Sequence, residues 1–258
     1  MFKRGQVSFS VVIGIVLLIL IGMLVVLYQQ GYFSKLSEVP KSTVLKGQAE
    51  DVKVVLGQCF KDKFLQAVYM VGLTGGHLAT ANPRLNLARG LDVGYGYFLG
   101  ENELSSREEI EFEISDYLNF AVPDCLNSVE IKEFTIVNSS VPSTRVNIYD
   151  DKVEAKLSYN IIVSKGDVKY TYEDLYDASY DIRLGRLHKF ASDIVKYEID
   201  DPDFIPFDFI EDFIDENGVL VDINDIDGNT DLNVYVIYDE KSNVNGVPYV
   251  FEFANRFR

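Results

Sequence analysis

The sequence predicts an α+β domain that follows one N-terminal transmembrane helix. An uncharged apolar stretch opens the chain, three later segments repeat apolar residues every three or four positions, and several others alternate apolar with polar residues. The first pattern is typical of a membrane-spanning helix, the second of helices with one buried side, and the third of half-buried strands. With 258 residues, the chain has room for one globular domain beyond the anchor.

The N-terminal segment is long enough to cross a bilayer. Residues 5–34 carry no charge, and the segment from Val7 to Tyr28 is apolar apart from two serines and two glycines. A helix of this length spans about 33 Å, which matches the hydrocarbon thickness of a bilayer. A buried core helix rarely lacks charge on every face. A cleaved secretory signal has a shorter apolar region and a small-residue cleavage site, so both alternatives fit less well.

The flanking charges predict the orientation of this segment. Lys3 and Arg4 lie in a six-residue tail, whereas the other flank carries a weaker positive excess. Because short basic tails stay in the cytoplasm, we expect the rest of the chain outside the cell. The predicted divisions are a cytoplasmic basic tail (1–6), a transmembrane helix (7–28), a juxtamembrane linker (29–43) and an extracytoplasmic α+β domain (44–258).

The basic tail resembles a known leader. The residues from Lys3 to Gln6 directly precede the apolar stretch and resemble the class III leader of archaeal type IV pilin-like proteins. The resemblance implies cleavage by a prepilin-type peptidase between Gly5 and Gln6. Assembling pilins usually carry a glutamate five residues into the mature chain, where this sequence has Ser10. Leader cleavage and filament assembly therefore stay open.

A wider likeness covers the leader, the segment around Cys59–Gly76 and the segment Asn245–Phe253. On these residues the chain resembles a group of membrane-anchored proteins of small-genome archaea with no established activity. The resemblance implies location and architecture alone.

Three helices are predicted in the domain from their apolar spacing, at residues 44–72, 106–121 and 184–197. The glycines after Thr74 suit the left-handed end of the first helix. Ser106 and Glu109 form a capping-box pattern at the start of the second. Pro123 is expected to end the second helix, because proline disrupts a helix interior.

The strands are predicted to form an antiparallel meander followed by a hairpin. The clearest one covers residues 152–163, where apolar and polar side chains alternate strictly. Further strands are expected near 131–137, 144–149, 168–172, 176–182, 232–238 and 249–253, with Asn245–Gly246 in the hairpin turn. Residues 77–104 are predicted as a loop or short hairpin, 204–210 as a short apolar segment, and 222–228 as a solvated turn.

The two cysteines, Cys59 and Cys125, both lie in the part expected outside the cell, where paired thiols normally oxidise. We therefore predict a disulfide, which by chain entropy would contribute roughly 4 kcal/mol. Two unrelated buried thiols are the alternative, and the position of Cys59 on an apolar helix stripe fits both.

Charge and motif content argue against several classes of function. Asp and Glu number 40 against 24 Lys and Arg, so nucleic acid is not an expected partner. The sequence shows no catalytic signature, phosphate-binding loop or dinucleotide fingerprint, so we expect neither a cofactor nor an enzyme. His77 and His188 are interpreted as lone packed or solvent-facing histidines, and no metal site is expected. A looser oxygen-ligand site within 222–228 is the alternative to the turn, because Ile223 stands where an EF-hand would need an acid.

Asn138 begins the acceptor pattern Asn138-Ser139-Ser140 for N-glycosylation. Its expected external location makes the site usable, and the pattern is short enough to occur by chance.

These observations predict a single-pass cell-surface protein with a structural or interaction role in the archaeal envelope. A type IV pilin-like filament subunit processed after Gly5 is the alternative, and an envelope enzyme fits less well. The expected partners are the lipid bilayer, through residues 7–28, and envelope or filament proteins, including further copies of the chain.

Overall fold

The computed structural model describes residues 41–78, 84–87, 90–127, 135–138, 140–202, 204–226 and 229–258. The predicted transmembrane helix, the Gly5–Gln6 cleavage site and residues 29–40 of the predicted linker lie outside the described residues. Within the described ranges, no helix has the length and apolar character needed to cross a membrane. Residues from Ala49 to Arg258 form one compact unit.

The described part of the chain is α+β, as predicted, with four helices and sheets in which antiparallel pairing dominates. The helices are α3 (Lys41–Leu73), α4 (Arg107–Asn127), α5 (Leu184–Asp200) and α6 (Phe207–Asn217). The strands are β1 (Arg84–Asn86), β2 (Asp92–Phe98), β3 (Glu101–Asn102), β4 (Thr135–Asn138), β5 (Ser143–Ile148), β6 (Val153–Lys165), β7 (Val168–Tyr180), β8 (Leu220–Ile226), β9 (Asn229–Val244) and β10 (Val247–Arg256).

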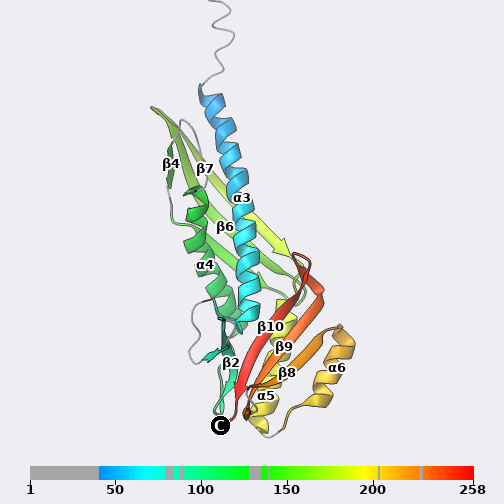
Figure 1. Cartoon of the computed structure of the whole chain (residues 1–258). Helices are drawn as coiled ribbons and strands as arrows, with labels where there is room; N and C mark the ends of the chain where they lie inside the picture. The colour runs from blue at the N-terminus through cyan, green and yellow to red at the C-terminus, as the bar shows by residue number, and fades with distance from the viewer. Residues whose placement is uncertain are drawn as a thin grey trace, which may run out of the picture. The chain divides into compact units, whose positions relative to one another are not determined.

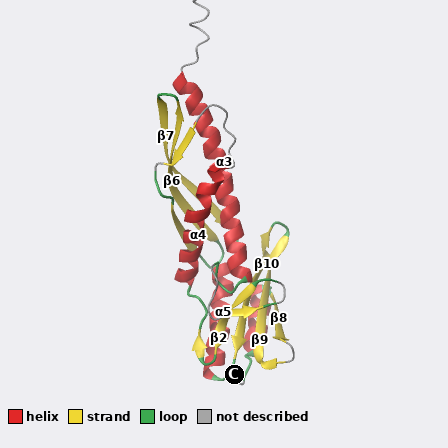
Figure 2. Cartoon of the chain, turned by 60° about the vertical axis from the view of Figure 1, so that its left-hand side comes forward, coloured by secondary structure: helices red, strands yellow, loops and turns green. Residues whose placement is uncertain are grey.

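The predicted meander forms the first sheet, in which β6 pairs with β7 on one side and with β4 and β5 on the other. All of these pairs are antiparallel. The two stretches expected at 168–172 and 176–182 are one continuous strand, β7. In Figures 1 and 2, α3 and α4 lie side by side over one face of this sheet. The other face of β6 carries polar side chains such as Lys156 and Ser158, which are exposed.

The second sheet has the order β1-β2-β10-β9-β8, with β3 added to β2. The predicted hairpin is confirmed: β9 and β10 are antiparallel and joined at Asn245 and Gly246, whose φ angles are 53° and 89°. Such positive φ angles are typical of a tight hairpin turn. The expectation of a purely antiparallel sheet is wrong at one place, because β2 pairs with β10 in parallel.

One hydrophobic core joins α3, α4 and α5 to the inner faces of both sheets. The stripe of α3 that the sequence indicates is buried throughout, at Val52, Leu56, Phe60, Phe64, Ala67, Val68 and Val71. A smaller cluster covers the opposite face of the second sheet, around Tyr95 and Val234. Strand β9 is therefore covered on both faces, since Tyr235 and Ile237 face the main core.

The prediction that Pro123 ends the second helix is wrong, because α4 continues to Asn127. Proline in a helix interior costs about 3 kcal/mol. The extra turn buries Val122, Cys125 and Leu126, each at most 8% exposed. Burial of these three side chains offsets the cost of the proline.

Three other segments have more regular structure than expected, and within 77–104 the hairpin alternative is confirmed, because β2 pairs antiparallel with β1 and β3. The Gly- and Tyr-rich piece within 77–104 contains β2, a buried strand whose residue Gly96 packs directly under Val195 of α5 and Phe253 of β10. The apolar segment at 204–210 leads into the helix α6. The acidic run at 222–228 is mostly strand, because β8 extends to Ile226, while residues 227 and 228 lie outside the described residues.

The last turns of α3 lie against β10 with no room for a side chain at Gly72. A Cβ atom there would lie 2.7 Å from Oη of Tyr249 and closer still to the carbonyl oxygen of Val250. Tyr249 donates a hydrogen bond of 2.9 Å to the carbonyl oxygen of Val68. The helix then ends as predicted, with Gly75 and Gly76 at positive φ.

We predict that Gly72→Ala destabilises the domain by about 1–3 kcal/mol, because the added methyl must push α3 away from β10. The free energy of unfolding, from chemical denaturation followed by circular dichroism, measures this. Gly47→Ala is the matched control: it lies in the same helix, and nothing lies within 4 Å of an added Cβ. That control should raise stability by up to about 1 kcal/mol. Equal effects of the two substitutions would contradict the close contact.

Candidate functional site

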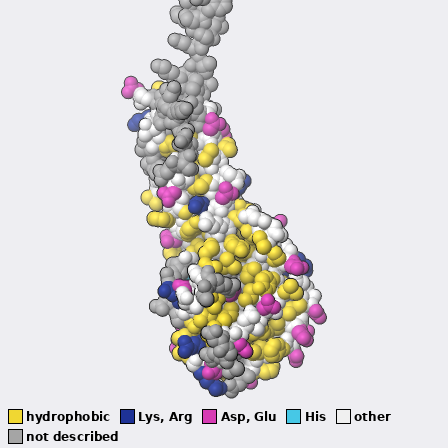
Figure 3. All heavy atoms as spheres, viewed as in Figure 1, with side chains coloured by type: hydrophobic (Ala, Val, Ile, Leu, Met, Phe, Trp, Pro, Cys, Tyr) yellow, Lys and Arg dark blue, Asp and Glu magenta, His cyan; other side chains and the backbone are white. Residues whose placement is uncertain are grey.

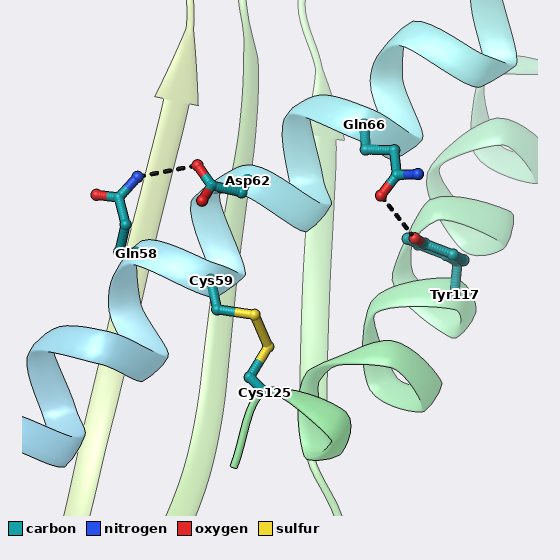
Figure 4. The surroundings of a disulfide bond; sticks show 6 residues. All are labelled: Gln58, Cys59, Asp62, Gln66, Tyr117 and Cys125. Atoms are coloured by element: carbon teal, nitrogen blue, oxygen red, sulfur yellow. Dashed lines mark hydrogen bonds between the residues drawn. A yellow bond between two sulfur atoms is a disulfide. The ribbon is translucent and has the colours of Figure 1, made fainter. Parts of the chain in front are cut away.

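The structure brings Cys59 and Cys125 together, although they are 66 positions apart in the sequence. Their sulfur atoms lie 2.01 Å apart, the distance of a disulfide bond. Cys59 lies in the middle of α3 and Cys125 in the last turn of α4, so the pair joins the two helices on the first sheet, as Figure 4 shows. Cys125 is 3% exposed.

Polar side chains of α3 and α4 lie near the cysteine pair. Gln58 donates a hydrogen bond of 2.9 Å to Asp62, one turn further along α3. Tyr117 of α4 donates to the side-chain oxygen of Gln66, 3.3 Å away (Figure 4). Because Cys125 is buried, a reductant or substrate has little access to its sulfur atom, which suits a structural cross-link.

We predict that replacing both cysteines by serine lowers the free energy of unfolding by about 2–5 kcal/mol. Thermal unfolding of the oxidised protein, of the same protein after reduction, and of the double variant measures this. Reduction of the unsubstituted protein should reproduce most of the loss, whereas the double variant should not respond to reductant. An unsubstituted protein whose stability is the same before and after reduction would contradict a stabilising cross-link.

The chain's two histidines converge on one residue, Ser105, directly before α4. Nε2 of His188 lies 2.6 Å from the carbonyl oxygen of Ser105. A carbonyl only accepts, so this nitrogen carries a proton and donates it. The Ser105 hydroxyl lies against the ring of His77, whose Nδ1 is 3.4 Å from Oε1 of Glu113. Both histidines are packed, which is one of the two predicted roles, and the structure adds that they share Ser105 as a neighbour.

Ser105, His77 and Glu113 have the residue types of a catalytic triad but not its geometry. Oγ of Ser105 is 3.1 Å from Nε2 and 3.3 Å from Nδ1 of His77. A hydroxyl that donates in line with Nε2 would lie much farther from Nδ1, so Oγ instead lies beside or above the ring. A general base must accept the nucleophile's proton along such a line. Ser105 is also 6% exposed, which leaves a substrate little access.

The same contacts have a clear structural role. The second carboxylate oxygen of Glu113 accepts a hydrogen bond of 2.5 Å from the backbone N–H of Leu78. The predicted capping box is confirmed, since the backbone N–H of Glu109 donates to Ser106 Oγ and that of Ser106 to the Glu109 carboxylate. These hydrogen bonds lower the pKa of Glu109. Burial lowers the pKa of His188, which keeps its ring neutral. The cluster thus fixes the connection between α3 and α4.

A second polar cluster is fully buried between α5 and the second sheet. Glu198 of α5 is 0% exposed and accepts hydrogen bonds from the Tyr235 hydroxyl and the Asn255 side-chain amide. The Asn255 oxygen in turn accepts from the backbone N–H of Tyr97, at 2.8 Å. Among the described residues, no cation pairs with Glu198. Burial raises the pKa of Glu198 to about 7, although both hydrogen bonds act in the opposite direction.

We predict that Glu198 makes the domain less stable as the pH rises from 5 to 8. Its pKa is raised in the folded state, so its stabilising contribution is full below the ordinary value of 4.5 and is lost as the pH passes about 7. This change amounts to about 2–3 kcal/mol. Chemical denaturation at both pH values should show it in the unsubstituted protein.

Between pH 5 and 8, the free energy of unfolding of the Glu198→Gln variant should change by about 2–3 kcal/mol less than that of the unsubstituted protein. Any destabilisation by the amide itself is the same at both pH values and does not affect this difference. Asp200→Asn, two residues further on and exposed, is the matched control and should leave the pH dependence unchanged. A Glu198→Gln variant with the same pH dependence as the unsubstituted protein would show that Glu198 does not titrate in this range.

A third cluster is an ion pair that holds α5 and α6 to β9. Arg183 donates through Nε to Asp239, at 2.9 Å, and through another guanidinium nitrogen to the carbonyl oxygen of Asn217. Ser242 also donates to Asp239, which is 0% exposed. Burial would raise the pKa of Asp239, but these hydrogen bonds hold it below the usual value. The Asp239 carboxylate is paired with Arg183 and Ser242, so its role is to hold these segments together.

The described residues line at least two open surface grooves, and neither of these is lined by a residue of the His77 or Glu198 clusters. The first, of about 550 Å³, is lined by Lys61, Glu154, Ala155, Lys156, Asp177, Ala178, Ser179 and Tyr180. The second, of about 410 Å³, is lined by Asp62, Leu65, Gln66, Tyr69, Val244, Asn245 and Val247. Neither lining includes a histidine or a cysteine.

The remaining site predictions have different outcomes. Gly5 and Gln6 lie outside the described residues. Asn138 ends β4, and its side chain is outside what the structure describes. Across the described ranges, no group of three or more His, Cys, Asp or Glu side chains is arranged to hold a metal ion. Sequence reasoning missed the three polar clusters, because their members come from segments far apart in the chain.

Comparison with known proteins gives no match: no family model fits the chain, and no curated protein or solved structure compared with it is detectably similar.

Proposed function

We propose that this chain is a single-pass membrane protein of the archaeal cell surface, with a structural or interaction role in the envelope. Residues 7–28 would anchor it in the bilayer, the basic tail would stay in the cytoplasm, and the α+β domain would lie outside. The observation that carries this proposal is the pairing of the chain's two cysteines in a domain that follows an uncharged apolar segment. Disulfides persist in oxidising compartments and are rare in the cytosol.

The charge of the chain supports the same location. The net charge is −16, and every Asp and Glu follows residue 34. Such a surface repels anionic lipid head groups and keeps the domain in solution beside the membrane. Lys3 and Arg4 directly before the span agree with the usual orientation rule, which depends on lysine and arginine close to the membrane.

The polar clusters favour a structural or interaction role over catalysis. The Arg183–Asp239 pair and the Glu198 cluster are buried, and the serine of the His77 cluster is nearly so. Each cluster connects two or more elements through hydrogen bonds. Catalytic groups must instead meet a substrate in an accessible site. Buried hydrogen-bonded clusters that hold helices and strands together suit a domain whose role is to bind other proteins through its surface.

A pilin-like filament subunit is the second candidate, favoured by the residues from Lys3 to Gln6. In that case a peptidase would remove the first five residues, and the chain would occur in surface filaments. Ser10, at the position where assembling pilins carry a glutamate, favours the first proposal.

The intact mass of the native protein, isolated without reductant from the host's membrane fraction, tests both proposals. We expect a membrane-bound chain in which neither Cys59 nor Cys125 reacts with a thiol reagent until reductant is added. A mass that begins at Met1 supports the anchored protein, whereas a chain that begins at Gln6 and sediments with sheared filaments supports the pilin-like subunit. A chain in the aqueous extract with two reactive thiols would refute both.

A further inference from the structure

Helix α6 has an apolar side against the domain and an acidic side against solvent. Phe209 and Phe213 pack on Phe190 of α5, with ring centres 5.5 and 3.8 Å apart. The opposite side carries what we call the α6 acidic row: Asp208, Glu211, Asp212, Asp215 and Glu216. All five residues are exposed.

The α6 acidic row is unfavourable for the isolated domain. Its members form like-charged pairs four residues apart, and such pairs destabilise a helix. Asp215 and Glu216 also lie near the negative end of the helix dipole. Within the described part of the chain, none of the five carboxylates has an ion-pair or hydrogen-bond partner. Arg183 and Arg186 donate hydrogen bonds to Asn217, the last residue of α6, and Lys241 lies beside Gly218, just past the end of the helix.

Exposed aromatic side chains adjoin the acidic row. Phe204 and Phe207, at the start of α6, are 53% and 57% exposed, and Tyr197, near the end of α5, is 47% exposed. The Tyr197 ring lies 5.1 Å from the ring of Phe209, which links it to the same corner. In Figure 3, Asp and Glu side chains gather at the edge where Figure 1 places α6, next to hydrophobic side chains. Exposed aromatic groups with a charged rim are typical of an interaction surface.

The charge of this surface decides what can cover it. A second copy of the chain has a net charge of −16 and would be repelled. Nucleic acid and anionic lipid are excluded for the same reason. A polypeptide segment with lysine or arginine on one side and apolar residues beside them would neutralise the carboxylates and bury the phenylalanines. Electrostatic complementarity of this kind gives specificity and fast association.

We propose that the outer face of α6, with Phe204 and Phe207, is the docking surface for a cationic amphipathic segment of another envelope protein. Cationic side chains of the partner lie along the α6 acidic row, and its apolar side chains cover the two phenylalanines. The location of the partner rests on the proposed function, whereas the surface and its chemistry do not.

Binding of a labelled amphipathic peptide of lysine and leucine to the full chain in nanodiscs of zwitterionic lipid tests this, with empty nanodiscs as the blank. One variant replaces the five acids of the α6 acidic row by their amides. Its matched control replaces five exposed acids elsewhere by their amides: Glu101, Asp151, Asp167, Asp177 and Asp181. A third variant is Phe204→Ser with Phe207→Ser.

We expect the α6 amide variant to weaken binding by about tenfold or more, the serine variant by about fivefold, and the matched control by less than about threefold. The α6 amide variant removes like-charge repulsion, so its thermal unfolding temperature should not fall, which separates lost binding from lost folding.

An equal loss in the matched control would show a general polyanion effect and would overturn the proposal. Unchanged binding by the serine variant would overturn the part of the proposal in which apolar side chains of the partner cover Phe204 and Phe207. Because the measurement uses purified protein, a failure of the docking proposal says nothing about where the chain lies in the cell. Equally, an error in the proposed cellular location would not change the measured affinity.

Discussion

The close contact of α3 with both sheets is the constraint on which the rest of the domain depends. One stripe of α3 faces the first sheet through Leu56 and Phe60 and reaches β10 of the second sheet at Gly72. The absence of a side chain at Gly72 lets Tyr249 reach the helix backbone at Val68. The paired cysteines then fix α4 beside the same helix. Two sheets that share no strand pair can therefore share one hydrophobic core.

The helices, strands and turns of the domain could be predicted where a single residue pattern determines the local structure and no tertiary contact opposes it. The stripe of α3, the alternation of β6, the capping box at Ser106 and the Asn245–Gly246 turn all have the structure that their patterns indicate. Errors arose where burial outweighed a local signal. Pro123 lies inside α4 because the turn after it is buried, and Gly96 lies in a strand because α5 needs a residue without a side chain there.

The arrangement of the sheets and of the polar clusters could not be predicted for a different reason. Nothing near β2 in the sequence specifies a parallel partner more than 150 residues later, because that pairing depends on the whole core. The contact of His77 and His188 with Ser105, and of Glu198 with Asn255, likewise depends on segments that meet only in the folded chain. By contrast, the acidic side of α6 is visible in the sequence, and the structure adds that its carboxylates are unpaired and adjoin exposed phenylalanines.

We propose that the cysteine-paired domain lies outside a cell membrane that the N-terminal segment crosses. Labelling intact cells with an amine reagent that cannot cross membranes, followed by peptide mapping, tests it most directly. The domain exposes Lys169 and Lys241, whereas Lys3 belongs to the tail expected in the cytoplasm. We expect Lys169 and Lys241 to be labelled on intact cells and Lys3 only after lysis. Labelling of Lys3 alone on intact cells, or of no lysine until lysis, would contradict it.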